Sequence, residues 1–306
     1  MGERKGRSIN TIIWIVFFCL LIGSAVQCDT PDLKKATYLT NQENLPVFVD
    51  SSDYESFVLN YHLIATADTI TWLQSLLPGD TLNAILVLNR IDQDHFDRTD
   101  TLVFPDSFLS GIDQYSPFPL RLDDLLKVQK IILVSYHAQA FAVYEKGDRI
   151  KWGPTSMGKE STPTPKGLFA VNWKAKRTVS TVDPTWIMDW YFNLDNFRGV
   201  SVHQYALPGY PVSHSCVRLY EEDAKWLYDW IDQWQLVEGK ISGYGTPVLI
   251  FGDYPFGQRK PWLNMAEKNT ILDLSPADLS SLFKEFLPTV LERQTQRDSL
   301  EGIDPH

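Results

Sequence analysis

Residues 202–219 read VHQYALPGYPVSHSCVRL, and this stretch determines the fold and the chemistry that we expect of the chain. The β-branched residues before His203 predict a strand that ends at this histidine. The Pro- and Gly-containing residues that follow predict a loop that returns the chain. Cys216 comes next, a few residues before the acidic run 221–223, which suits the positive end of a helix. Two histidines and a thiol therefore lie close together in one strand–loop unit.

Cys216 is the candidate nucleophile of this unit. A thiol reacts as its thiolate, and a nearby imidazole and a helix N-terminus lower a thiol pKa from about 8.5 to below 7.5. We therefore expect a lowered pKa for Cys216. The backbone N–H groups of residues 214–216 can hold an oxyanion, and one such donor is worth about 3 kcal/mol. Arg218 can bind a carboxylate through its planar guanidinium.

Two other interpretations of these residues stay open. The spacing of His203, His214 and Cys216 permits three ligands of a zinc ion. Alternatively, Cys216 is a buried and inert thiol, although the polar neighbours Ser213 and Ser215 disfavour an apolar pocket.

Three motifs that follow one another along the chain resemble those of a known catalytic domain. Residues 213–219 resemble the Ser-His-Gly-Cys signature of the L,D-transpeptidase (YkuD-type) domain, to which a strand-ending histidine such as His203 also belongs. Residues 164–169 resemble its Thr-Pro-x-Gly-x-aromatic segment, and residues 157–159 the Gly-Lys pair just before it. The landmarks span residues 128–252. Ser215 stands where Gly is usual, and if the backbone there needs a positive φ, the serine costs about 1 kcal/mol.

The resemblance implies a role for each matching residue. Cys216 would be the nucleophile, His203 the general base, and the backbone carbonyl of Gln204 the group that orients the imidazole. The oxyanion loop would comprise Ser213, His214 and Ser215, and the substrate-binding residues would be Arg218, Gln204, Tyr205, Trp186 and Trp190. The family acts on peptidoglycan stem peptides through a Cys thioester, forms 3–3 cross-links, needs no metal or cofactor, and is inhibited by carbapenem-type β-lactams.

Aromatic residues gather between the two halves of the resemblance. They are Trp173, Trp186, Trp190, Tyr191 and Phe192. This stretch resembles the lid over the substrate groove of the family. The alternative is an aromatic mini-core that holds a long insertion together.

Residues 128–252 are predicted to be mainly β, as a sandwich or barrel with one packed helix. Apolar runs at 131–134, 141–144 and 247–251 predict strands, and Gly147-Asp148 predicts a hairpin turn. Residues 221–237 predict the helix, with Gly239 at its end. Its apolar face would pack in the core through Trp226, Leu227, Trp230, Ile231 and Trp234.

Two flanking regions are expected. Residues 46–125 predict an α+β domain, and the order of 79–82, 88–89 and 102–105 resembles a LysM peptidoglycan-binding module. The alternative is an ordinary α+β domain in which Gly79-Asp80 makes a turn. Residues 262–306 predict a helical tail that begins at Ser275-Pro276. Its apolar stripe favours docking on a neighbouring domain over membrane binding: Leu279, Leu282, Phe283 and Phe286.

The amino terminus, residues 1–28, resembles an export signal. Three basic residues precede the apolar run 12–22 and the small residues 23–25. The run is short for a transmembrane anchor, which is the alternative. Cys28 lies where a bacterial lipoprotein cysteine would, so lipidation and plain cleavage both stay open. Residues 29–45 predict a tether, and we expect export to the bacterial envelope, in the periplasm or cell wall.

Composition narrows the function classes. The 306 residues carry a formal net charge of −10, which argues against nucleic-acid binding. Three cysteines exclude a disulfide scaffold, and a membrane contact is expected only through an N-terminal anchor. Two alternatives to transpeptidation remain: hydrolysis at the same site, as an L,D-carboxypeptidase or endopeptidase, and a non-catalytic wall-binding protein.

Overall fold

The structure is a computed structural model that describes residues 59–65, 77–109, 111–180, 183–268, 272 and 274–302. Internal contacts divide the chain into residues 1–44 and 45–306, and all described residues belong to the second unit. The predicted export signal, Cys28 and the tether therefore lie outside the described residues.

The larger of the two main sheets has five strands. They are β3 (Ile131–Ser135), β4 (Ala140–Glu145), β5 (Asp148–Pro154), β6 (Gly167–Ala170) and β13 (Pro247–Phe251), in the order β5-β4-β3-β13-β6. Only β3 and β13 run parallel. The β4–β5 turn has positive φ at Lys146 and Gly147, one residue before the predicted turn, because Glu145 pairs with Asp148.

The second sheet has four strands and carries the predicted chemistry. They are β7 (Lys174–Val179), β8 (Ile187–Asp195), β9 (Val200–Gln204) and β10 (Val217–Leu219), in the order β10-β9-β8-β7. β9 and β10 are parallel, and their register places Arg218 opposite His203. Loop 205–216 makes the return that this parallel pairing requires.

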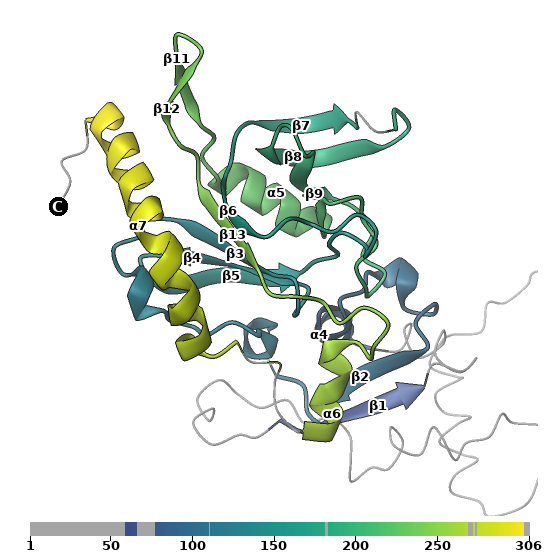
Figure 1. The fold of residues 1–306 in the computed structure, drawn as a ribbon. Helices are drawn as coiled ribbons and strands as arrows, with labels where there is room; N and C mark the ends of the chain where they lie inside the picture. The colour runs from purple at the N-terminus through teal and green to yellow at the C-terminus, as the bar shows by residue number, and fades with distance from the viewer. Residues whose placement is uncertain are drawn as a thin grey trace, which may run out of the picture. The chain divides into compact units, whose positions relative to one another are not determined.

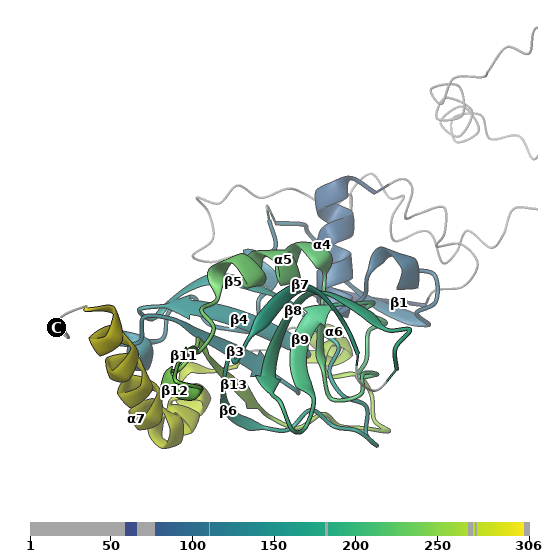
Figure 2. The same ribbon diagram turned by 90° about the horizontal axis from the view of Figure 1, so that it is seen from above.

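The main core lies between these two sheets and helix α5 (Glu221–Trp230). Alternate side chains of β3 and β4, such as Ile132 and Phe141, pack with Phe192 and Val202 of the second sheet and with Leu227 of α5. Figures 1 and 2 show α5 running alongside both sheets. The prediction of a mainly-β domain with one packed helix is confirmed.

The predicted length of this helix is wrong. It ends at Trp230 rather than at residue 237, because Ile231 adopts an extended conformation (φ −72°, ψ 149°). The backbone N–H of Trp234 then bonds the carbonyls of Val171 and Asn172. Residues 235–237 form β11 (Gln235–Val237), which pairs with β12 (Lys240–Gly243), and Gly239 lies in the turn between them.

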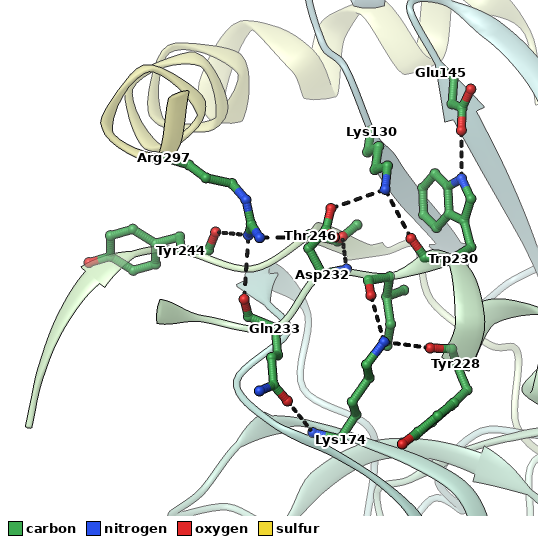
Figure 3. Close-up of polar contacts among 11 residues, drawn as sticks. Lys130, Glu145, Lys174, Tyr228, Trp230, Asp232, Gln233, Tyr244, Thr246 and Arg297 are labelled. Atoms are coloured by element: carbon green, nitrogen blue, oxygen red, sulfur yellow. Dashed lines mark hydrogen bonds and ion pairs between the residues drawn. The ribbon is translucent and has the colours of Figure 1, made fainter. Parts of the chain in front are cut away.

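Distant basic side chains cover the exposed carbonyls at the end of α5. Lys174 Nζ donates to the carbonyls of Tyr228 (2.7 Å) and Ile231 (2.9 Å), and Lys130 Nζ donates to that of Trp230 (3.0 Å). Figure 3 shows these bonds converging from three segments of the chain. A helix C-terminus leaves carbonyls without partners and favours cations, so this arrangement fixes where α5 stops.

Asp232 and Arg297 complete this group of charges. Asp232 accepts a hydrogen bond from Lys130 (3.0 Å) and lies 3.9 Å from Arg297, which donates to the carbonyl of Tyr244 (2.8 Å) (Figure 3). We call Lys130, Lys174, Asp232 and Arg297 the α5 terminus cluster.

The N-terminal flanking region is α+β, as predicted. Strand β1 (Tyr61–Ala65) pairs antiparallel with β2 (Thr101–Pro105), and α4 (Gly79–Asn89) packs on β2. Gly79 and Asp80 open α4 rather than forming a turn. Arg90 ends the helix in a left-handed conformation, and its buried guanidinium donates to the carbonyl of Ala138 (2.9 Å), which joins this region to the β3–β4 turn of the five-stranded sheet.

The C-terminal tail docks as predicted. After α6 (Met265–Lys268), the side chain of Ser275 accepts from the N–H of Asp278 (3.2 Å) and caps α7 (Pro276–Glu301). Leu279 and Phe283 are buried, and Gln129 donates to Asp298 (3.1 Å). Figures 1 and 2 both show α7 at one end of the five-stranded sheet. No helix within the described ranges is long and apolar enough to span a membrane.

Short 3₁₀ turns complete the described elements. They are η3 (Gln93–His95), η4 (Asp113–Tyr115), η5 (Asp123–Leu125) and η6 (Pro261–Asn264).

Candidate active site

The strand register brings His203 and Cys216 to one pocket. His203 is near the end of β9, and Cys216 immediately precedes β10, its parallel neighbour. Both line a cavity of about 140 Å³ together with Arg218. The remaining lining residues are Trp173, Thr178, Val179, Ser180, Trp186, Met188, Tyr191, Gly199, Ser201, Tyr205, Ser213 and His214. The β7–β8 hairpin thus supplies one wall, and the strand–loop unit 199–218 supplies the other.

His203 is a neutral imidazole with a defined tautomer. Its Nδ1 lies 2.8 Å from the backbone carbonyl of Gln204, an acceptor, so we assign the ring proton to Nδ1. Nε2 is then the nitrogen that can take up a proton. Burial lowers the pKa of His203 to about 4, and the side chain is only 5% exposed. At neutral pH the ring is therefore a base rather than a cation.

Cys216 contradicts the expected pKa direction. Its Sγ lies 3.2 Å from the Oγ of Ser201 and 3.7 Å from the carbonyl of Gly199. Burial raises the pKa of the Cys216 thiol, and the Ser201 hydrogen bond and the Arg218 charge only partly oppose it. Strand β10 separates Cys216 from the N-terminus of α5, which explains why the helix does not lower the thiol pKa as predicted.

A neutral thiol and a neutral imidazole thus share the pocket. Such a pair does not hold a preformed thiolate at neutral pH. It can still produce one on demand, if Nε2 of His203 takes the thiol proton as an electrophile approaches.

Loop 213–215 is braced by the segment that resembles the Gly-Lys motif. The N–H groups of Val212 and Ser213 both donate to the carbonyl of Met157 (2.9 and 3.0 Å), and Lys159 N–H donates to the Ser213 carbonyl (3.0 Å). The hydroxyl of Ser213 donates back to the Cys216 carbonyl (2.5 Å). The loop is therefore held on both sides of Cys216.

Ser215 has the positive φ that its glycine-like position suggested. Its φ is 79°, and its hydroxyl donates to the carbonyl of Thr162 (3.3 Å), which offsets part of the backbone strain. The turn leaves three backbone donors without partners: within the described residues, no hydrogen bond uses the N–H of His214, Ser215 or Cys216. These groups suit an oxyanion.

The predicted substrate-binding residues divide into two groups. Arg218, Tyr205 and Trp186 line the pocket, with the Arg218 guanidinium 4.4 Å from the centre of the Tyr205 ring. Gln204 contributes its backbone carbonyl to His203, and its side chain is not part of the pocket lining.

Trp190, a predicted substrate-binding residue, does not line the pocket. Its ring packs against Tyr228 of α5 (5.7 Å between centres) and lies near Lys225. A positive φ of 53° at Trp190 interrupts the alternation of β8, so Met188 and Tyr191 face the cavity instead. Of the aromatic stretch, Trp173, Trp186 and Tyr191 belong to the pocket, whereas Phe192 belongs to the core.

His214 lies at the pocket edge. Its ring is 5.0 Å from that of Trp186, and its Nε2 is 3.1 Å from Nζ of Lys159. Within the described ranges, no three His, Cys, Asp or Glu side chains converge as a metal site requires, so the zinc interpretation gains no support.

Sequence reasoning missed Ser201. It lies two residues before His203 on one strand, and residues spaced by two share a face of a sheet. That spacing was a usable signal. The hairpin residues Thr178 and Ser180 carried no comparable signal, because they reach the pocket only through the β7–β8 pairing.

Comparison with known proteins supports the resemblance for one part of the chain. Residues 129–250 match the model of the YkuD family, the L,D-transpeptidase catalytic domain. L,D-transpeptidase 2 of Mycobacterium tuberculosis (strain CDC 1551 / Oshkosh) is 27% identical over 132 residues, which are 38% of this chain. The match spans 32% of that relative, about a third of its length.

Two solved structures are also similar. An L,D-transpeptidase of Stackebrandtia nassauensis is 25% identical with a TM-score of 0.35, covering 42% of this chain and 58% of its own. L,D-transpeptidase 1 of Mycobacterium tuberculosis is 25% identical with a TM-score of 0.32, covering 41% and 62%. The three ordered motifs all lie within residues 129–250, the part of the chain that matches the model of the L,D-transpeptidase catalytic domain of the YkuD type.

Proposed function

We propose that this chain is a cysteine-dependent L,D-transpeptidase that acts on peptidoglycan stem peptides and forms 3–3 cross-links. The observation that carries the proposal is one pocket that holds a thiol, a neutral imidazole oriented by a backbone carbonyl, and a loop with unpaired N–H donors. This is the set of groups that acyl transfer through a thioester needs.

The first half of the reaction forms the thioester. Cys216 gives its proton to Nε2 of His203 as Sγ bonds to the carbonyl carbon of the stem's diamino acid. The negative charge moves to the carbonyl oxygen, where the N–H groups of residues 214–216 can stabilise it. The C–N bond then breaks, and the imidazolium returns the proton to the departing amine of D-alanine.

The second half reverses the roles. An amine of a second stem attacks the thioester carbonyl while Nε2 of His203 takes its proton. The C–S bond breaks, and the proton passes to the sulfur, which restores the neutral thiol. Arg218 and Tyr205 on the pocket wall suit the carboxylates of stem peptides.

The proposal extends to inhibitors and to location. Solved relatives include an L,D-transpeptidase in complex with imipenem and an avibactam carbamoyl enzyme. We expect carbapenem-type β-lactams to acylate Cys216 of this chain. The basic, apolar and small-residue pattern of residues 1–28 supports export to the envelope, where the substrate is found.

The test is mass spectrometry of purified muropeptides after incubation with the protein. Transpeptidation predicts a cross-linked dimer that has lost one D-alanine. A trimmed monomer alone would assign the site to hydrolysis, and unchanged muropeptides with a folded protein would contradict both enzymatic functions.

A further inference from the structure

A chain of hydrogen bonds reaches Cys216 through strands β8 and β9. It begins at Asn172, whose Nδ2 donates to Oδ1 of Asn193 (2.9 Å). Nδ2 of Asn193 donates to the hydroxyl of Tyr191 (3.0 Å), and Tyr191 is hydrogen-bonded to Ser201. Ser201 Oγ then lies 3.2 Å from Sγ of Cys216. The chain crosses strands β8 and β9 and ends on the sulfur.

The side chains that lead to the sulfur are almost completely buried. Ser201 is 1% exposed, Asn193 4% and Tyr191 6%. The sheet fixes them, because Asn193 and Ser201 are direct cross-strand partners. A polar group buried this deeply costs free energy unless it has a hydrogen-bond partner. A network in which each group has a partner also restricts the orientation of each hydroxyl.

Ser201 is the member of this network that touches the sulfur, and either Ser201 Oγ or Cys216 Sγ can be the donor across their 3.2 Å contact. An amide N–H of Asn193 donates to the Tyr191 oxygen. Burial raises the pKa of Tyr191, and the hydrogen bond with Ser201 partly opposes this rise, as a donor to that oxygen does. Burial also raises the pKa of Cys216, and the hydrogen bond with Ser201 partly opposes this rise, so a Ser201 O–H directed at the sulfur favours the thiolate. The thiol proton has its own acceptor, the carbonyl of Gly199 (3.7 Å), in the resting state.

We propose that Ser201 is a further catalytic residue, whose hydroxyl donates a hydrogen bond to Cys216 Sγ when the thiol proton leaves for His203, with Tyr191 and Asn193 as positioning residues. The proposal rests on the proposed thiol function of Cys216. Ser201 keeps its own proton throughout, so no extra group is transferred. Hydrogen bonds to a charged atom are stronger than those to a neutral one, so this bond favours the thiolate over the thiol.

The experiment measures alkylation of Cys216 by iodoacetamide across pH in the full-length protein, with the modified cysteine assigned by peptide mass. We expect Ser201→Ala to slow alkylation at pH 8 by about ten-fold and to move the pH profile upward. Tyr191→Phe should act in the same direction by a smaller factor, and Ser201→Thr should restore most of the rate. Ser242→Ala, at a half-buried serine of β12 that does not line the pocket, is the control and should leave the profile unchanged.

An unchanged pH profile for Ser201→Ala, with a folded protein, would overturn the proposal. If Ser201→Ala unfolds, the pH profile of Tyr191→Phe tests the proposal instead. A Tyr191→Phe profile identical to that of the wild type would then overturn the proposal. Alkylation needs no peptidoglycan, so these outcomes are independent of whether the protein makes cross-links. A protein that alkylates as predicted but forms no muropeptide product would refute the proposed function and leave the role of Ser201 intact.

Discussion

The pocket and the α5 terminus cluster are two polar regions of one domain, and they treat their polar groups in opposite ways. In the cluster, Lys130 and Lys174 bond helix carbonyls, and Asp232 balances neighbouring charge. In the pocket, Nε2 of His203 and the N–H groups of loop 214–216 have no partner within the described residues. Paired groups stabilise the fold. In the pocket, the unpaired N–H donors can bind the oxygen of a reacting carbonyl, and the unpaired Nε2 can accept the thiol proton.

Because of this difference, we expect substitutions in the pocket to change activity and substitutions in the α5 terminus cluster to change stability. The largest expected effect is at the nucleophile. Cys216→Ala should abolish cross-linking and β-lactam adducts, because no other group in the pocket can form the thioester, with little change in melting temperature. Muropeptide analysis and thermal melting check this, and residual turnover would end the cysteine mechanism.

His203→Ala should come next. Loss of a general base typically costs 10²–10⁴-fold in rate. We expect a loss of acylation rate in that range, measured by single-turnover mass spectrometry with a carbapenem. The matched variant is His214→Ala, which should act mainly through the loop and reduce the rate less. The reverse order would exchange the roles of the two histidines.

The buried His203 also gives the folded protein a pH-dependent stability. In the unfolded chain this side chain binds a proton below about 6.5, whereas in the folded chain it does so only below about 4. Its contribution to stability is therefore complete above pH 6.5 and is lost as the pH falls toward 4, by about 3 kcal/mol. Denaturant unfolding at several pH values measures this, with His203→Gln as the subtraction control. An identical pH dependence in both proteins would contradict the burial of a neutral imidazole.

Lys174→Met tests the other region. It removes two hydrogen bonds from a cation to carbonyls at the end of α5 and should destabilise the protein by about 2 kcal/mol, with unchanged alkylation of Cys216. Lys176→Met, at an exposed position of the same strand, is the matched control and should be within about 0.5 kcal/mol of wild type. If Lys174→Met lost activity but not stability, the α5 terminus cluster would serve the reaction rather than the fold, contrary to this expectation.

The smallest effect is expected at Ser215. Replacement by Gly removes the strain of a φ of 79° but also the bond to Thr162, so Ser215→Gly should stabilise the protein by up to about 1 kcal/mol. Chemical denaturation measures this difference. Destabilisation would show that the hydroxyl contributes more than the backbone conformation costs.

Local patterns predicted the elements whose causes are local. The buried runs of β3 and β13, the strand that ends near His203 and the Ser275 cap of α7 all depend on neighbours in sequence. The positive φ of Ser215 was also foreseeable, because its position in the motif favours glycine.

Features set by distant residues could not be predicted in this way. The end of α5 depends on Lys130 and Lys174, which are far from it in sequence. The raised pKa of Cys216 depends on burial by several segments, and sequence proximity to a helix start gave the wrong direction. Trp190 does not line the pocket because its backbone has a positive φ, which no residue pattern indicated.

The most direct test of the central claim is the intact mass of the protein after incubation with a tetrapeptide stem donor and no acceptor. Acylation of Cys216 predicts a mass increase equal to the donor minus D-alanine, located on Cys216, absent in Cys216→Ala and slow to form in His203→Ala. An adduct on any other residue, or the same adduct at the same rate in His203→Ala, would contradict it.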